Sequence, residues 1–216
     1  MKTPIVGVIF SRADLQRALR MRRPPDLFEI RLDRLVNSIE EVSAALDRLP
    51  ARFIITARDP REGGANHLSA PRRRALLLQF LPRAAWVDVE LRSVRALAPV
   101  LRYARAHGVP AIISFHDFKT TPSAARLDEI VDSAQSLSAA LIKVATRTDT
   151  PAELARLLDF FERHRLTANI MPMGMGKLGR TSRLQLARRG SITYVHLGSP
   201  SAAGQLSIRD LRRALK

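Results

Sequence analysis

Residues 111–144 read AIISFHDFKTTPSAARLDEIVDSAQSLSAALIKV, and this stretch decides the fold. An apolar run at 111–115 precedes a helical pattern over 123–137, and a second apolar run follows at 140–144. Pro122 stands at the beginning of the helical pattern, where proline is typical of a helix start. Two strands with a helix between them predict a parallel sheet covered by helices.

The same alternation continues through all 216 residues of the chain. Eight apolar runs are expected to be strands: 5–10, 27–32, 53–57, 86–91, 111–115, 140–144, 168–173 and 192–197. Helical patterns are expected at 39–49, 70–80, 94–107, 123–137, 151–164 and 208–215. Eight strands with helices between them predict a single α/β domain over 1–216, a (β/α)8 TIM barrel with outer helices. The alternative is an open doubly wound sheet, but no GxGxxG motif follows the first strand.

The composition is typical of a globular protein, with 46% hydrophobic and 26% charged residues. No apolar run approaches the length of a membrane span, and the N-terminus lacks a signal-peptide pattern. We therefore expect a cytoplasmic protein. The chain has no cysteine, and its five histidines form no HExxH pair. This pattern predicts neither a metal site nor a cofactor.

The formal net charge of +16 raises the alternative of a nucleic-acid-binding protein. However, the basic residues are spread along the chain, and the longest basic run is only Arg72–Arg74. A positive field also attracts small anionic substrates. Only five of the 36 basic residues are lysines, so a lysine inside an apolar run needs a specific reason.

Charged and polar side chains gather where the predicted strands end, which is where barrel enzymes place their chemistry. Glu29, Arg31 and Asp33 alternate along the second strand, and Asp88 and Glu90 alternate along the fourth. Alternate residues share one face of a strand. Charges on an inward face must pair with one another or with a ligand.

Lys143 lies in the apolar sixth strand and His116 at the end of the fifth. Burial disfavours the charged form of a lysine, and a neutral amine can form a Schiff base with a ketone. The alternative for Lys143 is a structural ion pair with an acidic residue such as Glu90. Because adjacent strands are about 4.8 Å apart, the imidazole and the amine could meet at the barrel mouth. The alternative for His116 is a hydrogen-bonded core histidine.

Four further residues flank strand ends. Arg58 and Arg183 could each bind a carboxylate through a bidentate contact, although either could be an ordinary charged residue in this arginine-rich chain. Met173 and Met175 could be core residues or an apolar wall for a small ring.

Seven motifs follow one another over roughly four-fifths of the chain: Glu29–Asp33, Thr56–Gly64, Asp88–Leu91, Ser114–Ser123, Ile142–Ala145, Met173–Arg183 and Ser201–Gln205. Together they resemble the type I 3-dehydroquinate dehydratases. The resemblance implies a (β/α)8 barrel that dehydrates 3-dehydroquinate to 3-dehydroshikimate in the shikimate pathway, with a homodimer as the expected assembly.

The resemblance also implies a role for each site residue. Lys143 would form an imine at the C3 ketone, and His116 would move protons at C2 and at the departing C1 hydroxyl. Glu62 would orient His116, and no metal would be needed, because the imine nitrogen accepts the electrons. The expected substrate contacts are Arg183, Ser201 and Gln205 for the carboxylate and a neighbouring hydroxyl, Arg58 and Glu29 for the ring hydroxyls, Arg31 for pairing with the acidic residues, and Met173 and Met175 for the apolar wall.

The sequence departs from the family pattern in two places besides its net charge. The chain begins almost at its first strand, so we expect it to lack the N-terminal hairpin that covers the barrel floor in longer members. The resemblance implies that Ser201–Gln205 lies on a mobile lid after the eighth strand. Ala203 stands where members often have proline, so we expect this lid to be looser. A different Schiff-base barrel, an aldolase, is the alternative enzyme, but it needs a phosphate site after strands seven and eight.

Overall fold

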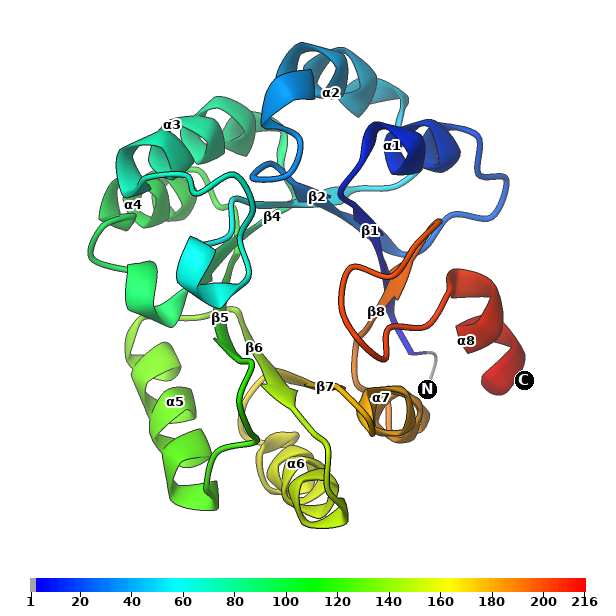
Figure 1. The fold of residues 1–216 in the computed structure, drawn as a ribbon. Helices are drawn as coiled ribbons and strands as arrows, with labels where there is room; N and C mark the ends of the chain where they lie inside the picture. Colours follow the sequence, from blue (N-terminus) through cyan, green and yellow to red (C-terminus); the bar gives the residue numbers. More distant parts are fainter. Residues whose placement is uncertain (1–2) are drawn as a thin grey trace.

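Eight parallel strands form the centre of the computed structural model, which describes residues 3–216 (Figure 1). The strands are β1 (Ile5–Ile9), β2 (Leu27–Arg31), β3 (Phe53–Thr56), β4 (Trp86–Glu90), β5 (Ala111–Asp117), β6 (Leu141–Arg147), β7 (Ile170–Met175) and β8 (Thr193–His196). The α-helices are α1 (Arg12–Leu19), α2 (Ile39–Ala45), α3 (Ala70–Phe80), α4 (Ala98–Ala106), α5 (Ala124–Ser136), α6 (Pro151–His164), α7 (Gly179–Arg188) and α8 (Ile208–Ala214). Short 3₁₀ helices are η1 (Val36–Ser38), η2 (Leu46–Arg48), η3 (Pro60–Glu62), η4 (Leu81–Arg83) and η5 (Leu91–Ser93).

The strands are ordered β7-β6-β5-β4-β3-β2-β1-β8, and every paired neighbour is parallel. The helices surround this nearly closed ring (Figure 1), which confirms the predicted (β/α)8 barrel. Within residues 3–216, β7 and β8 share no strand ladder. Arg183 of α7 spans this seam, because its guanidinium donates to the Gly174 carbonyl of β7 at 3.1 Å and to the Tyr194 carbonyl of β8 at 3.4 Å.

The predicted element boundaries are close to the observed ones, and α3 and α6 match them at both ends. Strand β5 extends past the predicted end to Asp117, so His116 lies inside a strand and not after it. Two helices, α1 and α7, were not predicted. The first is short and polar, and the second begins directly after a glycine-rich segment, so neither has a long apolar period.

Local signals explain how α6 begins and how it supports the neighbouring loop. Thr150 and Glu153 form a capping box, in which each side chain accepts from the other residue's backbone N–H. Glu153 also accepts from the Thr120 hydroxyl at 2.7 Å and from the Thr121 N–H at 3.1 Å. The start of α6 therefore holds the loop that follows β5 and His116.

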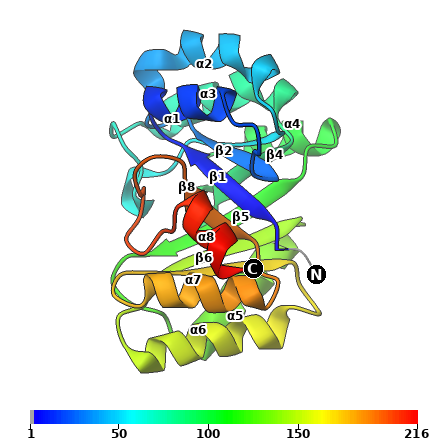
Figure 2. The same cartoon turned by 90° about the vertical axis from the view of Figure 1, so that its right-hand side faces the viewer.

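The barrel interior is divided into layers. At the end where the strands begin, the inward side chains are apolar and include Leu27, Trp86 and Leu141. Two residues further along the same strands, the inward side chains are Glu29, Asp88 and Lys143. The polar layer lies toward the end where the strands finish, on the left in Figure 2. Among residues 3–216, no helix combines the length and the apolar character needed to cross a membrane.

One residue of the basic run Arg72–Arg74 is not a surface charge. Arg73 is only 1% exposed, because the period of α3 places it on the helix's buried face with Leu76 and Leu77. Its guanidinium donates to the Ala57 carbonyl at 2.7 Å, to Asp59 at 2.8 Å and to Glu90. Arg73 thus ties the loop after β3 to the end of β4.

Candidate active site

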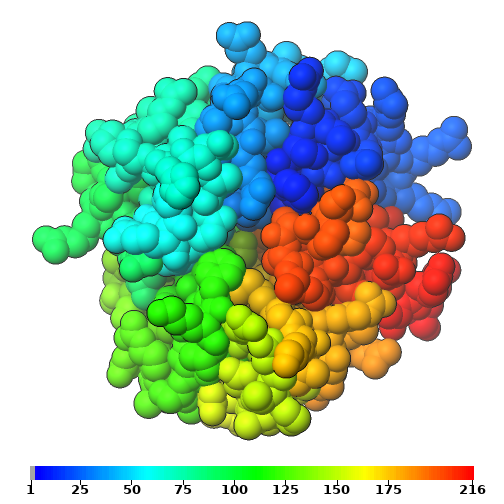
Figure 3. Space-filling model, in the orientation of Figure 1, coloured from blue at the N-terminus to red at the C-terminus, as the bar shows by residue number. Residues whose placement is uncertain are grey.

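A cavity of about 230 Å³ opens at the end of the barrel where the strands finish. Figure 3 looks onto this end, which is bordered by the segment around residue 62 in cyan and the loop near residue 200 in orange-red. The structure brings all the predicted site residues to this cavity. They are Glu29, Arg31, Arg58, Glu62, His116, Lys143, Met173, Met175, Arg183, Ser201 and Gln205.

Lys143 lies at the bottom of this cavity and is only 4% exposed. Its ammonium nitrogen Nζ lies 3.1 Å from a Glu29 carboxylate oxygen and 3.3 Å from an Asp88 oxygen. The Tyr194 ring centroid lies 4.0 Å from Nζ. Inward residues of alternate barrel strands share a layer, and here the layer of β2, β4, β6 and β8 surrounds one amine. Lys143 is therefore paired with acidic residues, as its alternative interpretation expected, but the partners are Glu29 and Asp88 and not the example Glu90.

Arg58 is the centre of a second buried ion network beside this layer. Its guanidinium donates to Asp88 at 2.9 Å, to Glu90 at 3.2 Å and to the Ser114 hydroxyl at 2.6 Å. Burial alone would lower the pKa of Arg58, but the carboxylates of Asp88 and Glu90 raise it above its ordinary value. In this geometry Arg58 positions Asp88, and most of its donors are already used.

His116 and Glu62 form a buried pair on the cavity wall. The His116 Nδ1 lies 2.9 Å from Glu62 Oε2, and the His116 backbone N–H donates to the same oxygen at 3.0 Å. Burial raises the pKa of Glu62 to about 7. Burial, reinforced by the Arg58 and Lys143 charges, lowers the pKa of His116 well below its ordinary value. A neutral imidazole with Nδ1–H bonded to a carboxylate leaves Nε2 as the proton acceptor.

His116 and Lys143 line the same cavity without a direct contact. Strand register explains this arrangement, because Ser114 is the neighbour of Lys143 while His116 pairs with Ala145, two residues further along. A substrate between the imidazole and the amine would therefore meet both groups. The His116 imidazole and the Lys143 amine therefore share a cavity at the barrel mouth, as expected, but form no hydrogen bond with each other.

Arg183 is a buried cation without an acidic partner among residues 3–216. It is 3% exposed, and within the described part of the chain its side chain donates only to the Gly174 and Tyr194 carbonyls. Burial lowers the pKa of Arg183 to about 10. An arginine fork that lines a cavity with no carboxylate beside it is suited to an anionic ligand.

The loop after β8 covers one side of the cavity. The Ser201 backbone N–H and hydroxyl donate to Gln205 Oε1 at 2.7 and 2.9 Å. Gly204 has φ +82°, and a Cβ there would lie 2.7 Å from the backbone of Gly179 and Arg180. This close approach requires glycine and fixes the loop against the start of α7.

The remaining predicted residues complete the wall. Met173 and Met175 are 5% and 7% exposed and present apolar surface to the cavity. Arg31 donates to Asp33 through two nitrogens, at 2.9 and 2.8 Å, and to the Gly63 carbonyl at 3.2 Å. It therefore anchors the loop that carries Glu62. Among residues 3–216, no group of three or more potential metal-binding side chains is assembled.

Four residues at the site were not among those predicted. Asp88 and Tyr194 contact Lys143 directly, and Phe118 stacks on His116 with centroids 6.5 Å apart.

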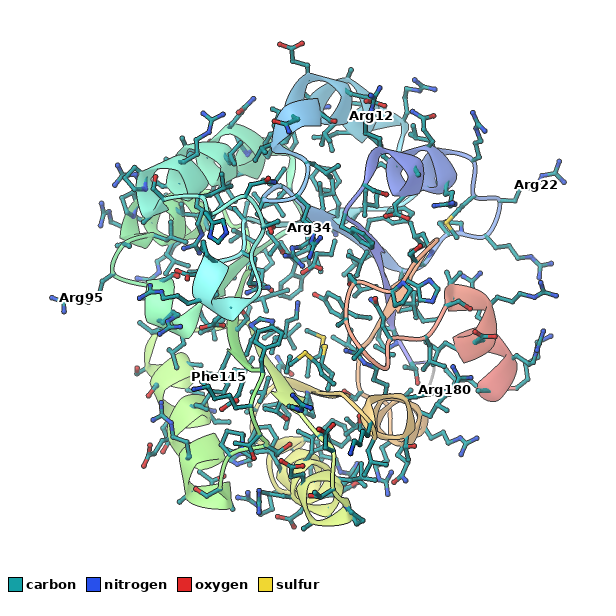
Figure 4. All side chains as sticks on the ribbon, viewed as in Figure 1. Arg12, Arg22, Arg34, Arg95, Phe115 and Arg180 are labelled. Carbon is teal, nitrogen blue, oxygen red and sulfur yellow. The ribbon has the colours of Figure 1, made fainter. Side chains whose placement is uncertain are left out.

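Arg34 lines the mouth and reaches inward in Figure 4, whereas the labelled Arg12, Arg22 and Arg95 point away from the barrel. The signal for Asp88 was its alternation with Glu90. Tyr194 carries no such signal, because an aromatic residue in a strand reads as core.

The fold and site together define a (β/α)8-barrel enzyme with a lysine, a histidine and an unpaired arginine in one cavity. The family model for type I 3-dehydroquinase matches residues 9–216. The 3-dehydroquinate dehydratase of Thermococcus gammatolerans is 34% identical over 213 residues, covering 98% of this chain and 97% of that protein. The chain therefore belongs to the type I 3-dehydroquinase family, as its motifs predicted.

Two solved structures are similar over almost the whole chain. The 3-dehydroquinate dehydratase from Geobacillus kaustophilus has a TM-score of 0.88 and 27% identity, covering 100% of this chain and 90% of that one. The type I enzyme from Clostridium difficile, with covalent modified comenic acid, has a TM-score of 0.86 and 26% identity, covering 99% and 91%. These relationships confirm the expected enzyme of the shikimate pathway over the aldolase and nucleic-acid alternatives.

Proposed function

We propose that this chain dehydrates 3-dehydroquinate through an imine on Lys143, with His116 as the general acid and base. One observation supports this most strongly. A single cavity of about 230 Å³ holds a buried primary amine at its base and, on its wall, a buried arginine that has no acidic partner within residues 3–216. A small keto acid offers a carbonyl to the first and a carboxylate to the second.

The proposed reaction begins with attack of the Lys143 amine on the C3 carbonyl, which loses water to give an iminium ion. When His116 removes a C2 proton, the C–H electron pair forms a C2=C3 double bond and the C=N π pair moves onto the nitrogen, which gives an enamine. The enamine then expels the C1 hydroxyl, which leaves as water with a proton from His116. Hydrolysis of the remaining imine releases 3-dehydroshikimate and restores the amine.

The residues around Nζ suit this sequence of charges. Glu29 and Asp88, which accept from the ammonium, would also lie beside the iminium cation that replaces it. Fixed carboxylates in a buried site stabilise developing positive charge without rearrangement. The Tyr194 ring, with its centroid 4.0 Å from Nζ, adds a cation–π contact.

Glu62 sets the chemistry of His116. By accepting from Nδ1–H, it would hold the tautomer whose free Nε2 can take a proton. The lowered pKa of His116 keeps the imidazole neutral, as a base requires, until it receives the C2 proton. Phe118, stacked beside the ring, limits its rotation.

Arg183, Ser201 and Gln205 are proposed to bind the carboxylate end of the substrate. The hydroxyl and N–H of Ser201 are bonded to Gln205 in the structure, so a carboxylate would have to replace those bonds. Arg34 supplies a second cation at the mouth. Glu29 is proposed to contact a ring hydroxyl, whereas the bonds of Arg58 to Asp88 and Glu90 suit a positioning role better.

A direct activity assay tests the proposal. The protein is mixed with 3-dehydroquinate, and the conjugated enone of the product is followed by its ultraviolet absorbance. We expect turnover by the native protein and none by Lys143→Met, which keeps much of the side-chain volume. Equal turnover by both would refute the role of Lys143. The homodimer, the cytoplasmic location and the single-domain boundary remain predictions.

A further inference from the structure

The barrel has a second cavity at its opposite end, where the strands begin. Its volume is about 470 Å³, within the range of roughly 300–1,000 Å³ typical of small-molecule sites. Every strand contributes one inward side chain to the wall: Val6, Leu27, Ile54, Trp86, Ile112, Leu141, Met171 and Tyr194. We call this space the floor cavity. Its base is the apolar layer directly beneath Lys143.

Among residues 3–216, the charged side chains that line the floor cavity are both arginines. Arg165 follows α6 and Arg189 follows α7, and the Nε of each forms an ion pair with the same partner, Glu162, at 2.7 and 3.1 Å. All three are partly exposed, with side-chain exposures of 44%, 39% and 43%. One carboxylate shared by two guanidinium groups leaves a net positive charge at this rim.

An exposed apolar side chain marks each end of the barrel. Among residues 3–216, the large hydrophobic side chains that are exposed are Phe118, at 46%, and Leu166, at 85%. Phe118 lines the catalytic cavity and Leu166 lines the floor cavity. Exposed apolar surface beside a concave site is typical of ligand binding. The floor cavity therefore shares this feature with the catalytic cavity.

Tyr194 connects the two cavities. It lines both of them, and its hydroxyl is buried without a hydrogen-bond partner among residues 3–216. A buried hydroxyl without a partner is costly, so a group that accepts from it would be stabilised there. Within the same residues the Trp86 indole N–H also has no protein acceptor, and it stands in the wall of the floor cavity.

We infer that the floor cavity binds an apolar molecule that carries one carboxylate. The apolar body lies against the layer of Leu27, Trp86 and Leu141, and the carboxylate accepts from Arg165 and Arg189. This site is independent of the proposed reaction, because none of these residues lines the catalytic cavity. Through Tyr194, its occupant lies one side chain away from Lys143.

Trp86 is the single tryptophan of the chain, so its fluorescence reports on this cavity alone. The full-length protein is titrated with decanoate, below the concentration at which micelles form, and separately with decan-1-ol. We expect saturable binding of decanoate with a shift of Trp86 emission to shorter wavelength, because the alkyl chain displaces water from the indole. Absence of a saturable shift overturns the inference. Equal affinity for decan-1-ol also overturns it, because the arginines would then contribute nothing.

Variants locate the site. Ala168→Phe, at a half-buried lining position, fills the cavity and should weaken decanoate binding at least about tenfold. Arg165→Gln combined with Arg189→Gln should weaken it by about two- to tenfold, as exposed ion pairs do. The matched change Glu162→Gln should tighten binding, because it releases both arginines from their carboxylate. All of these variants should turn over 3-dehydroquinate at the native rate.

Two outcomes would assign the probe to another place. If Arg183→Ala abolishes decanoate binding while Ala168→Phe leaves it intact, the probe occupies the catalytic cavity and the inference is wrong. If Ala168→Phe converts a dimer to a monomer in sedimentation, the cavity is an interface between copies and the inference is also wrong. Should Ala168→Phe fail to fold, the exposed arginine and glutamate variants still decide the matter.

Discussion

The two ends of this barrel are built from the same eight strands but have opposite chemistry. On β2, β4 and β6, the floor presents Leu27, Trp86 and Leu141, and the next inward residue on each strand is charged. Two residues along a strand are about 6.6 Å apart. The barrel therefore changes from an apolar layer to an ionic layer within one step of the pleat.

This difference shows what the apolar floor does for the catalytic layer. Apolar side chains lie beneath Lys143 on the floor side, and its partners in the barrel are the carboxylates of Glu29 and Asp88 and the ring of Tyr194. Charges in such a site interact more strongly than in water. The mouth holds the groups that we propose to react, and the floor supports them with an apolar layer.

The largest effect after loss of the lysine is expected at His116. His116→Ala should lower kcat by about 10²–10⁴, the range typical of general acid–base catalysis. The imine can still form in this variant, and it should accumulate because its hydrolysis also needs proton transfer. Rapid-quench mass spectrometry would detect the accumulated adduct. Near-native turnover would remove His116 from the mechanism.

A smaller effect is expected at the cation of the mouth. Arg183→Ala should raise KM by about ten- to a hundredfold, because a hydrogen bond to a charged group contributes about 1.5–3 kcal/mol. Arg180→Ala, at an exposed position three residues earlier, should change KM little. Because Arg183 also spans the seam between β7 and β8, the melting temperature of each variant is measured, and Arg183→Lys serves as a second control. Similar KM values for Arg183→Ala and Arg180→Ala would mean that only the general positive field matters.

The pH profile should separate Glu62 from the rest of the mouth. Burial raises the pKa of Glu62 to about 7, and the protonated acid accepts from His116 Nδ1–H more weakly than the carboxylate does and no longer stabilises an imidazolium. The kcat/KM of the native protein should therefore rise with pH through about 7 and then level off. Glu62→Gln should lower the plateau and abolish this rise, since the amide does not titrate. An unchanged rise in Glu62→Gln would assign it to another group.

The smallest effect is expected where the two ends meet. Tyr194→Phe keeps the ring over Nζ and removes the unpartnered hydroxyl, so kcat should stay within about twofold of native. Tyr194→Leu removes the ring and should lower kcat by about two- to fivefold, the value of a cation–π contact of about 0.5–1 kcal/mol. Comparison of the two variants in the steady state isolates the ring. Equal rates would show that only bulk is needed there.

The sequence predicted which residues gather in one cavity better than it predicted what each one contacts. Strand alternation and order in the chain were enough to bring Glu29, His116 and Lys143 to the same end of a barrel. They could not tell that Asp88, and not Glu90, lies beside Lys143, because that depends on which inward residues share a layer. Glu90 is instead held by Arg58 and Arg73.

Buried ion pairs were the hardest feature to predict. Arg73 belongs to an exposed-looking basic run, and only the rotation of α3 against β3 and β4 places it inside. Tyr194 was missed for a different reason: an aromatic residue in a strand is expected to pack in the core, so nothing in the sequence indicates a contact with a charged group. Its contact with Nζ depends on closure of the ring, which brings β8 beside β1.

Trapping the proposed imine tests the central claim most directly. Native protein is incubated with 3-dehydroquinate and borohydride, then digested and analysed by mass spectrometry. We expect one covalent adduct, reduced and stable, on the peptide that contains Lys143, and none in Lys143→Arg, which keeps the charge but has no nucleophilic amine. Turnover without any adduct, or an adduct on Lys119 or Lys177, would contradict it.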